Sequence, residues 1–223
     1  MYKRQEWISI QYPDDRSFRT LTWQYEKQDG GYKYGGYLQT QDGDLYQYKG
    51  NTGITNTAPD KIINWEDWRG GVIYKILTIP SKSENQYFLL SFHQADTFTK
   101  CKVLEPVVIK EDKVELGGQG LFEIPDRDLK AKRLVLEYSA DSQAAINYQP
   151  TPGQLVLDHL VTIAGRIPGQ GPTRTADGTY VAYQLADDGS WKYIEKLYNQ
   201  KFVDPPNGGI SSKGKDIFGN PKN

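Results

Sequence analysis

Apolar and polar residues alternate with a period of two along most of the chain, as in strands that bury one face. In the strand that this pattern predicts at residues 17–26, one face carries Leu21, Trp23 and Tyr25. Asp29-Gly30-Gly31 predicts a tight turn, because glycine adopts the positive φ angles that short hairpin turns need. Strands at 32–40 and 45–49 follow. The N-terminal part is therefore expected to be an antiparallel meander.

Further short strands are separated by turns rich in Gly, Asp and Asn. They are predicted at 72–79, 86–93, 102–110, 113–116, 121–124, 133–139, 144–148, 154–160, 179–186 and 191–198. One short helix is expected near 61–68, with Asp60 as its N-cap and Gly70-Gly71 ending it. About a dozen strands with one helix predict a mainly β fold, in which antiparallel meander sheets form a barrel or a sandwich.

The domain organisation follows from length and from the composition of the C-terminal end. With 223 residues, the chain is long enough to bury a core of its own, and residues 1–203 are expected to form a single β-rich domain. Residues 204–223 hold Pro205-Pro206, several glycines and lysines and little apolar content, which predicts a flexible, disordered tail. The chain opens almost directly into strand-like sequence, so the possibility of a missing N-terminal part stays open.

Charge and cysteine content exclude several classes of function. The chain has 27 basic and 28 acidic side chains, and a near-neutral chain has no general attraction for phosphate backbones, so nucleic-acid binding is not expected. A single cysteine excludes an internal disulfide framework and a cysteine-cluster zinc site. No apolar run approaches the ~20 residues of a membrane-spanning helix. Residues 7–12 are too short and too alternating for a signal peptide.

No catalytic motif is assembled in the sequence, and no catalytic residue, metal ligand or cofactor is predicted. Asp158 and His159 are neighbours, but adjacent side chains of a strand point to opposite faces, so His159 is expected in the core beside Leu155 and Leu157. Cys101 is expected to be a small buried thiol. The Gly-rich segments lack the spacing of phosphate-binding loops.

Aromatic residues, at 13% with 16 Tyr and 5 Trp, are the most informative feature of the composition. Tyr32, Tyr34 and Tyr37 crowd one meander, where flat rings on a sheet stack on sugars; the alternative is that they cover half-buried sheet surface. Trp65 and Trp68 share a face of the predicted helix. They either fill the core or form an exposed clamp. These five residues are the candidate ligand-binding residues.

A series of short motifs in the last hundred residues carries a resemblance to a known family. The motifs are Leu136-Glu137-Tyr138-Ser139-Ala140, Ile146-Asn147-Tyr148, Asp158-His159-Leu160, Gly169-Gln170-Gly171, Asp177-Gly178-Thr179-Tyr180, Trp191-Lys192-Tyr193-Ile194-Glu195-Lys196 and Lys215-Asp216-Ile217-Phe218-Gly219-Asn220. Over roughly residues 60–223 the chain resembles a family of hypothetical Bacteroidota proteins, usually exported to the cell envelope, without an assigned function. The resemblance implies a periplasmic or envelope location. The chain itself carries no export signal, and a cytoplasmic location is the alternative.

The sequence therefore predicts a non-catalytic β-rich envelope protein that binds a partner protein or a glycan. In the tail, Ile217 and Phe218 form one apolar anchor and are the candidate residues for docking to a protein partner. The alternative function is a hydrolase of envelope carbohydrate or peptide, whose carboxylates the fold brings together. A cleft with two facing carboxylates, or an acid within reach of His159, distinguishes this alternative.

Overall fold

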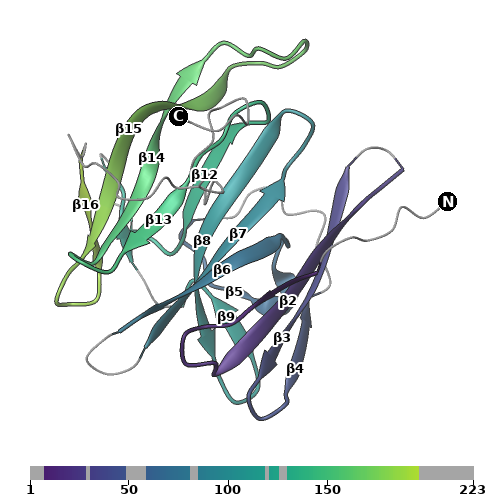
Figure 1. The fold of residues 1–223 in the computed structure, drawn as a ribbon, viewed down its shortest axis with the longest axis vertical. Coiled ribbons are helices and arrows are strands. Elements are labelled where there is room, and N and C mark those ends of the chain that lie inside the picture. The colour runs from purple at the N-terminus through teal and green to yellow at the C-terminus, as the bar shows by residue number, and fades with distance from the viewer. Residues whose placement is uncertain are drawn as a thin grey trace, which may run out of the picture.

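The computed structural model describes residues 8–28, 31–48, 59–80, 85–118, 121–125 and 130–195. These residues form three sheets, which are seen edge-on as successive layers in Figure 1. The predicted mainly β fold with antiparallel meanders is confirmed, and the open, layered sheets correspond to the sandwich alternative. The tail predicted at 204–223, with Ile217 and Phe218, lies outside the described residues.

The N-terminal sheet is a four-stranded antiparallel meander in the order β1-β2-β3-β4. Its strands are β1 (Ser9–Gln11), β2 (Phe18–Glu26), β3 (Tyr32–Thr40) and β4 (Leu45–Tyr48). The sequence pattern predicts β2 and β3 almost to the residue, because the alternation is strict and the turns between them are rich in Asp and Gly.

The central sheet has the order β5-β9-β8-β7-β6. A further strand, β12, pairs with the first half of β8, whereas β9 pairs with its end. Its strands are β5 (Ile63–Asn64), β6 (Val72–Ile79), β7 (Gln86–Gln94), β8 (Thr99–Ile109), β9 (Val114–Leu116) and β12 (Leu134–Ser139). It is joined to the N-terminal sheet by polar contacts. Ser9 Oγ donates to the Ile73 carbonyl at 2.5 Å, and the Ile73 N–H donates to Thr22 Oγ1 at 2.9 Å.

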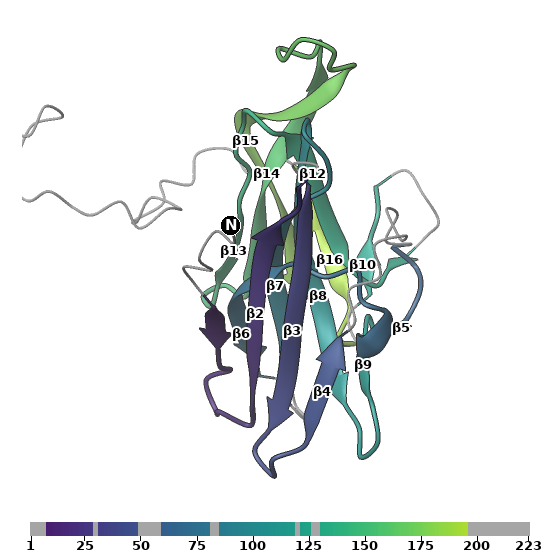
Figure 2. The same ribbon diagram turned by 90° about the vertical axis from the view of Figure 1, so that its right-hand side faces the viewer.

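The C-terminal sheet has the order β11-β10-β16-β15-β14-β13. Its strands are β10 (Phe122–Glu123), β11 (Lys130–Ala131), β13 (Ile146–Gln149), β14 (Gln154–Ile163), β15 (Thr173–Leu185) and β16 (Trp191–Ile194). The pairing of β10 with β16 is parallel, whereas the other pairings in this sheet are antiparallel. The β14–β15 hairpin extends beyond the body of the molecule (Figures 1 and 2).

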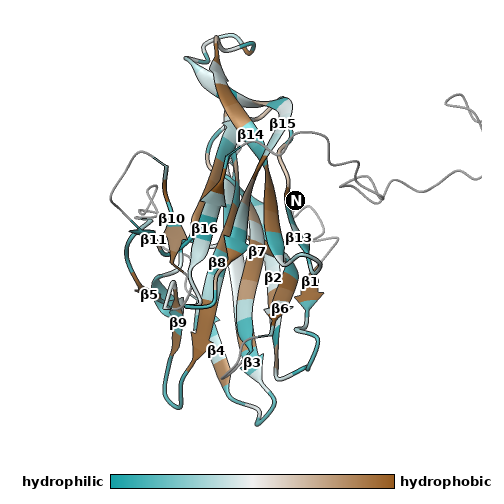
Figure 3. Ribbon diagram, turned by 90° about the vertical axis from the view of Figure 1, so that its left-hand side faces the viewer, coloured by the Kyte–Doolittle hydropathy of each residue, from teal (hydrophilic) through white to brown (hydrophobic). Residues whose placement is uncertain are grey.

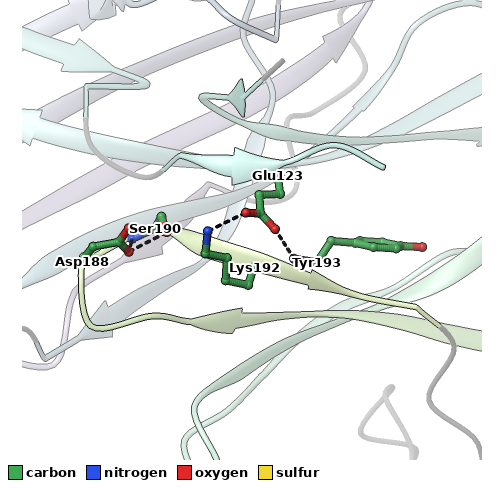
Figure 4. A network of polar contacts seen from close by, with 5 residues as sticks. All are labelled: Glu123, Asp188, Ser190, Lys192 and Tyr193. Carbon is green, nitrogen blue, oxygen red and sulfur yellow. Dashed lines mark hydrogen bonds and ion pairs between the residues drawn. The ribbon is translucent and has the colours of Figure 1, made fainter. Parts of the chain in front are cut away.

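A small polar network secures the parallel pair (Figure 4). Lys192 Nζ lies 2.6 Å from Glu123 Oε1, and the Tyr193 N–H donates to Glu123 Oε2 at 3.4 Å. Asp188 accepts from both the N–H and the hydroxyl of Ser190, which fixes the turn before β16. The hydrogen bond from Lys192 lowers the pKa of Glu123. The network thus holds two segments that are far apart in sequence side by side.

The two faces of the central sheet contribute to two different hydrophobic cores. Two neighbouring residues of β7 belong to different cores. Leu90 packs against the C-terminal sheet, and Leu89 packs against the N-terminal sheet. Rings fill the first core, where Trp191 stacks on Phe122 and meets Phe88 edge-on. In Figure 3 the brown, apolar stretches follow the strands, whereas the turns are mostly teal. The central sheet is therefore covered on both faces.

The short helix predicted near 61–68 is present, but it is shorter than predicted. The structure has a single 3-10 turn, η1 (Trp65–Asp67), and residues 63–64 form β5, which pairs with β9. The residue before the turn is Asn64, whose side chain makes no capping hydrogen bond. Pairing of Ile63 with Leu116 overrides the local helical pattern, because tertiary contacts outweigh propensity in so short a segment.

Candidate functional site

The outer face of the N-terminal sheet is the candidate functional site. In Figure 2 this sheet lies in front of the other two, with β1 to β4 following one another across the view. Residues of even number on β2 and β3, such as Phe18 and Leu38, point inward into the core. The opposite positions form the outer face, which consists of Ile10, Arg19, Leu21, Trp23, Tyr25, Lys33, Gly35, Tyr37, Gln39, Leu45 and Gln47.

Two aromatic rings form a platform at the middle of this outer face. Trp23 lies directly across from Gly35, and its indole covers that glycine: a Cβ at residue 35 would lie 2.6 Å from Cε2 and Cζ2 of Trp23. The Tyr37 ring lies 5.9 Å from the Trp23 ring, tilted by 36°. Tyr25 is 48% exposed on the same face. The missing side chain at Gly35 therefore lets the indole lie against the sheet, where Trp23 is half-buried.

Hydrogen-bonding groups flank the platform toward the β1–β2 turn. Arg19 Nε donates to Gln39 Oε1 at 2.8 Å, and Arg19 Nη1 donates to the Tyr12 hydroxyl at 3.3 Å. The guanidinium carbon of Arg16 lies 5.8 Å from the centre of the Tyr12 ring. An apolar, aromatic surface bordered by fixed polar groups is the composition of a ligand-binding surface.

The three candidate tyrosines separate between the two faces of the sheet. Tyr37 belongs to the outer face, whereas Tyr34 packs inward, where its hydroxyl accepts a hydrogen bond from the Gln94 N–H at 2.8 Å. Burial raises the pKa of Tyr34. Tyr32 is half-buried and has the same parity as Tyr34 on β3. Tyr34 therefore serves packing, and of the three predicted rings only Tyr37 lies on the platform.

Trp65 and Trp68 fill the core and do not form an exposed clamp. Their exposed fractions are 1% and 0%, and their rings stack at 5.1 Å and 18°. Tyr48 meets both of them edge-on. Both indoles are buried, so the structure places them as the core alternative expects.

A charged pair is buried beside these tryptophans. Arg133 Nε lies 2.7 Å from Glu105 Oε1, and both side chains have 0% exposure. Glu105 Oε2 also accepts a hydrogen bond from Trp68 Nε1 at 2.7 Å. The pair is sealed from solvent, so it contributes to the structure of the core and offers no access to a ligand.

Cys101 and His93 lie directly opposite each other on β8 and β7, which the sequence could not show. Burial raises the pKa of the Cys101 thiol to about 12. Burial, together with the positive charge of Arg69, lowers the pKa of His93 to about 3. A thiolate is the nucleophilic form of cysteine, so a neutral thiol beside a neutral imidazole is poorly suited to covalent catalysis. The predicted small buried thiol is confirmed.

The expectation that His159 lies in the core is wrong. A register shift between Asp158 and Leu160 interrupts the pairing of β14 with β15, and the His159 side chain is 33% exposed. Its Nδ1 lies 2.9 Å from Asp177 Oδ2. Hydrogen bonds from Thr179, and then from His159, lower the pKa of Asp177 to about 2. Asp158 instead accepts from the Ala145 N–H at 2.8 Å.

An acid therefore lies within reach of His159, as the hydrolase alternative requires. The Thr179 hydroxyl donates to Asp177 at 2.7 Å and is held there. Among the contacts of the described residues, no hydroxyl or thiol donates to His159 as a nucleophile would. The pair thus has an orienting acid and an imidazole, without the nucleophile contact that completes a triad.

Trp23 is the residue of the site that the sequence-based selection missed. Its place on one face with Leu21 and Tyr25 follows from the alternation, but which face meets solvent depends on the central sheet. The signal that could have found it is Gly35 in the interior of a strand, since glycine there often marks the close approach of another group.

The fold and the outer face define a layered β-sandwich protein with an aromatic platform on one outer sheet. Comparison with known proteins gives no match among family models, curated proteins or solved structures. Over the part of the chain that the structure describes, no helix is both long and apolar enough to cross a membrane. Within the same residues, no three His, Cys, Asp or Glu side chains gather as metal ligands do.

Proposed function

We propose that this protein is a non-catalytic binding module of the cell envelope that recognises carbohydrate through the outer face of its N-terminal sheet. The single observation that carries the proposal is the Trp23–Tyr37 platform over Gly35. The envelope location is supported by the resemblance of the C-terminal motifs. The test described below also distinguishes a carbohydrate from a protein partner as the ligand of this face.

The geometry of the platform supports a sugar as its ligand. The C–H groups on the flat face of a pyranose pack against an aromatic ring, while its hydroxyl groups need hydrogen-bond partners at the edge. Trp23 and Tyr37 supply two rings at a mutual tilt of 36°. Gln39 and Gln47 supply amide groups on the same face. Both rings sit on paired strands, so the surface is already ordered before a ligand binds.

The test is affinity electrophoresis of the whole chain in gels that contain soluble β-glucan, xylan, mannan, polygalacturonate or dextran sulfate. We expect at least one polysaccharide to retard the protein. Replacement of Trp23 by Ala should weaken that binding at least fivefold, which corresponds to about 1 kcal/mol for the lost stacking contact. Trp23→Phe, which keeps an aromatic ring over Gly35, should recover part of the affinity.

Tyr74→Ala is the matched control, because Tyr74 is a 36% exposed aromatic residue of β6, away from the platform. It should bind as the wild type does. If the Trp23→Ala variant is retarded as strongly as the wild type, the polysaccharide binds at a surface other than the platform. If no polysaccharide retards the folded wild type, and the protein instead binds a protein partner through Trp23, the ligand of this face is a protein and the carbohydrate proposal is wrong.

A further inference from the structure

Charged side chains on the outer face are all basic. The outward positions of the four strands include Arg19 and Lys33 and no Asp or Glu. The β1–β2 turn adds Arg16, which is exposed beside Tyr12. The turn also holds two acids: Asp15 is directed toward the central sheet, where its carboxylate accepts from Tyr87 and Asn85, and Asp14 is exposed, with its backbone N–H bound to Thr78. Within the described residues, the outer face thus combines an aromatic platform with positive charge.

Arg19 is held in place with part of its guanidinium left available. Its two contacts, Gln39 Oε1 and the Tyr12 hydroxyl, are both neutral and involve Nε and Nη1. Among the residues that the structure describes, the contacts of Arg19 use Nε and one N–H of Nη1, so N–H groups remain on both Nη atoms at the outer end of the guanidinium. This is the edge that binds a carboxylate through two parallel hydrogen bonds.

Arg16 occupies a backbone conformation that argues for a role of its side chain. Its φ of 56° lies in the left-handed region, where it is the only non-glycine residue among those the structure describes. Glycine or asparagine would adopt this conformation at lower cost. With arginine there, the guanidinium lies over the ring of Tyr12 at cation–π distance, and the Tyr12 hydroxyl contacts Arg19. Tyr12 therefore lies between two cations.

We propose that the carbohydrate recognised by this face is acidic, and that Arg16 and Arg19 form a subsite for the carboxylate of a uronic acid residue. This inference rests on the proposed function and adds the class of ligand. Arg19 and Trp23 are four residues apart on one face of β2, about 13 Å along the strand. A chain several sugars long therefore reaches from the platform to the subsite.

The inference is tested by isothermal titration with oligogalacturonate and, in parallel, with its fully methyl-esterified counterpart, which is neutral. The wild type should bind the acid at least fivefold more tightly than the ester, and added salt should reduce the difference. Arg19→Gln should remove this preference, because it weakens binding of the acid far more than binding of the ester. Arg174→Gln, the same change of charge at an exposed position of β15, should keep the preference.

Arg16→Gly separates binding from folding. Because glycine relieves the positive φ angle, the melting temperature should not fall, whereas affinity for oligogalacturonate should decrease. Equal binding of acid and ester by the wild type would overturn the acidic subsite and leave the platform proposal standing. If the protein binds dextran sulfate but not oligogalacturonate, the subsite does not recognise a carboxylate and this inference is wrong. If neither Trp23→Ala nor Arg19→Gln affects binding, both proposals fail.

Discussion

At the scale of single residues, the most consequential feature of the core is the sealed pair of Glu105 and Arg133. Such a pair gains little net stability over an apolar pair, because both charges lose their hydration. Removing one partner is a different matter, since the other is left buried without compensation. Glu105 has a second partner, the Trp68 indole N–H, so its carboxylate links the ring cluster to the segment that leads into β12.

Replacement of Arg133 by Met should destabilise the protein by about 3 kcal/mol, because it removes the ion-pair partner of the buried Glu105 carboxylate. The double variant Arg133→Met/Glu105→Gln should regain at least half of that loss, since a glutamine still accepts from Trp68 while carrying no charge. Urea unfolding measures both free energies. A loss below about 1 kcal/mol in the single variant would show that the pair is not sealed.

Residue by residue, the sequence predicts which side chains share a face but not which face is buried. Trp23 and Tyr25 alternate with Thr20 and Thr22, and the aromatic side would ordinarily be assigned to the core. The structure buries Thr20 and Thr22 completely and leaves Tyr25 exposed. The opposition of His93 and Cys101, and the contact of His159 with Asp177, depend on strand register, which alternation alone does not determine.

At the scale of elements, most strands were predictable, and the short helix was predicted in the right place but too long. The bounds of β3 and β6 match the predicted ranges, because their alternation is regular and turn residues flank them. β15 is longer than predicted: it begins at Thr173 and passes through Asp177 and Gly178, which resemble a turn in sequence. Pairing with β14 on both sides, at Ala176 and Tyr180, carries the strand across this stretch, which bulges at Gly178 with a φ of 84°. Where a long-range partner decides the conformation, local pattern is a poor guide.

The β1–β2 turn is an element whose attachment depends on pH. Partial burial raises the pKa of Asp15, but hydrogen bonds from Tyr87, Ser17 and Asn85 outweigh this and lower it to about 2. An aspartate whose folded pKa lies below its unfolded value adds stability above about pH 4. That stability is lost as the pH falls toward 2. The Asp15 contacts therefore hold the turn to the central sheet most strongly while Asp15 is ionised, beside the hydrogen bond from the Asp14 N–H to Thr78 Oγ1.

Replacement of Asp15 by Asn should lower the melting temperature by a few degrees at pH 7. The difference from the wild type should shrink as the pH is lowered from about 4 to 2, because the wild type then protonates Asp15 and loses the same interaction. Thermal melts of both proteins over that range, followed by circular dichroism, provide the measurement. A difference that is constant with pH would contradict the role of the ionised carboxylate.

At the scale of the whole molecule, one sheet takes part in both hydrophobic cores. Leu89 and Leu90 are adjacent in β7, buried at 0% and 1%, and belong to different cores. If the central sheet couples the layers, a destabilising substitution in either core should lower the free energy of unfolding of the whole protein. Separate layers would instead melt independently.

Leu89→Ala and Leu90→Ala form a matched pair that tests this coupling. Each should destabilise the protein by about 2–5 kcal/mol, the usual cost of a leucine-sized cavity. Each should also shift a single unfolding transition that is the same by calorimetry and by tryptophan fluorescence. Two resolved transitions, of which each variant moves only one, would show that the layers unfold separately.

The alternation within β2 and β3 also separates two kinds of selective constraint. Inward positions such as Phe18, Thr22 and Leu38 are fixed by the core, whereas outward positions such as Arg19 and Gln39 contact solvent and one another. A substitution at an outward position therefore leaves the packed interior untouched. The sheet offers a surface on which binding preference is free to diverge between descendants, or to be rewritten by a protein engineer, while the scaffold beneath it stays the same.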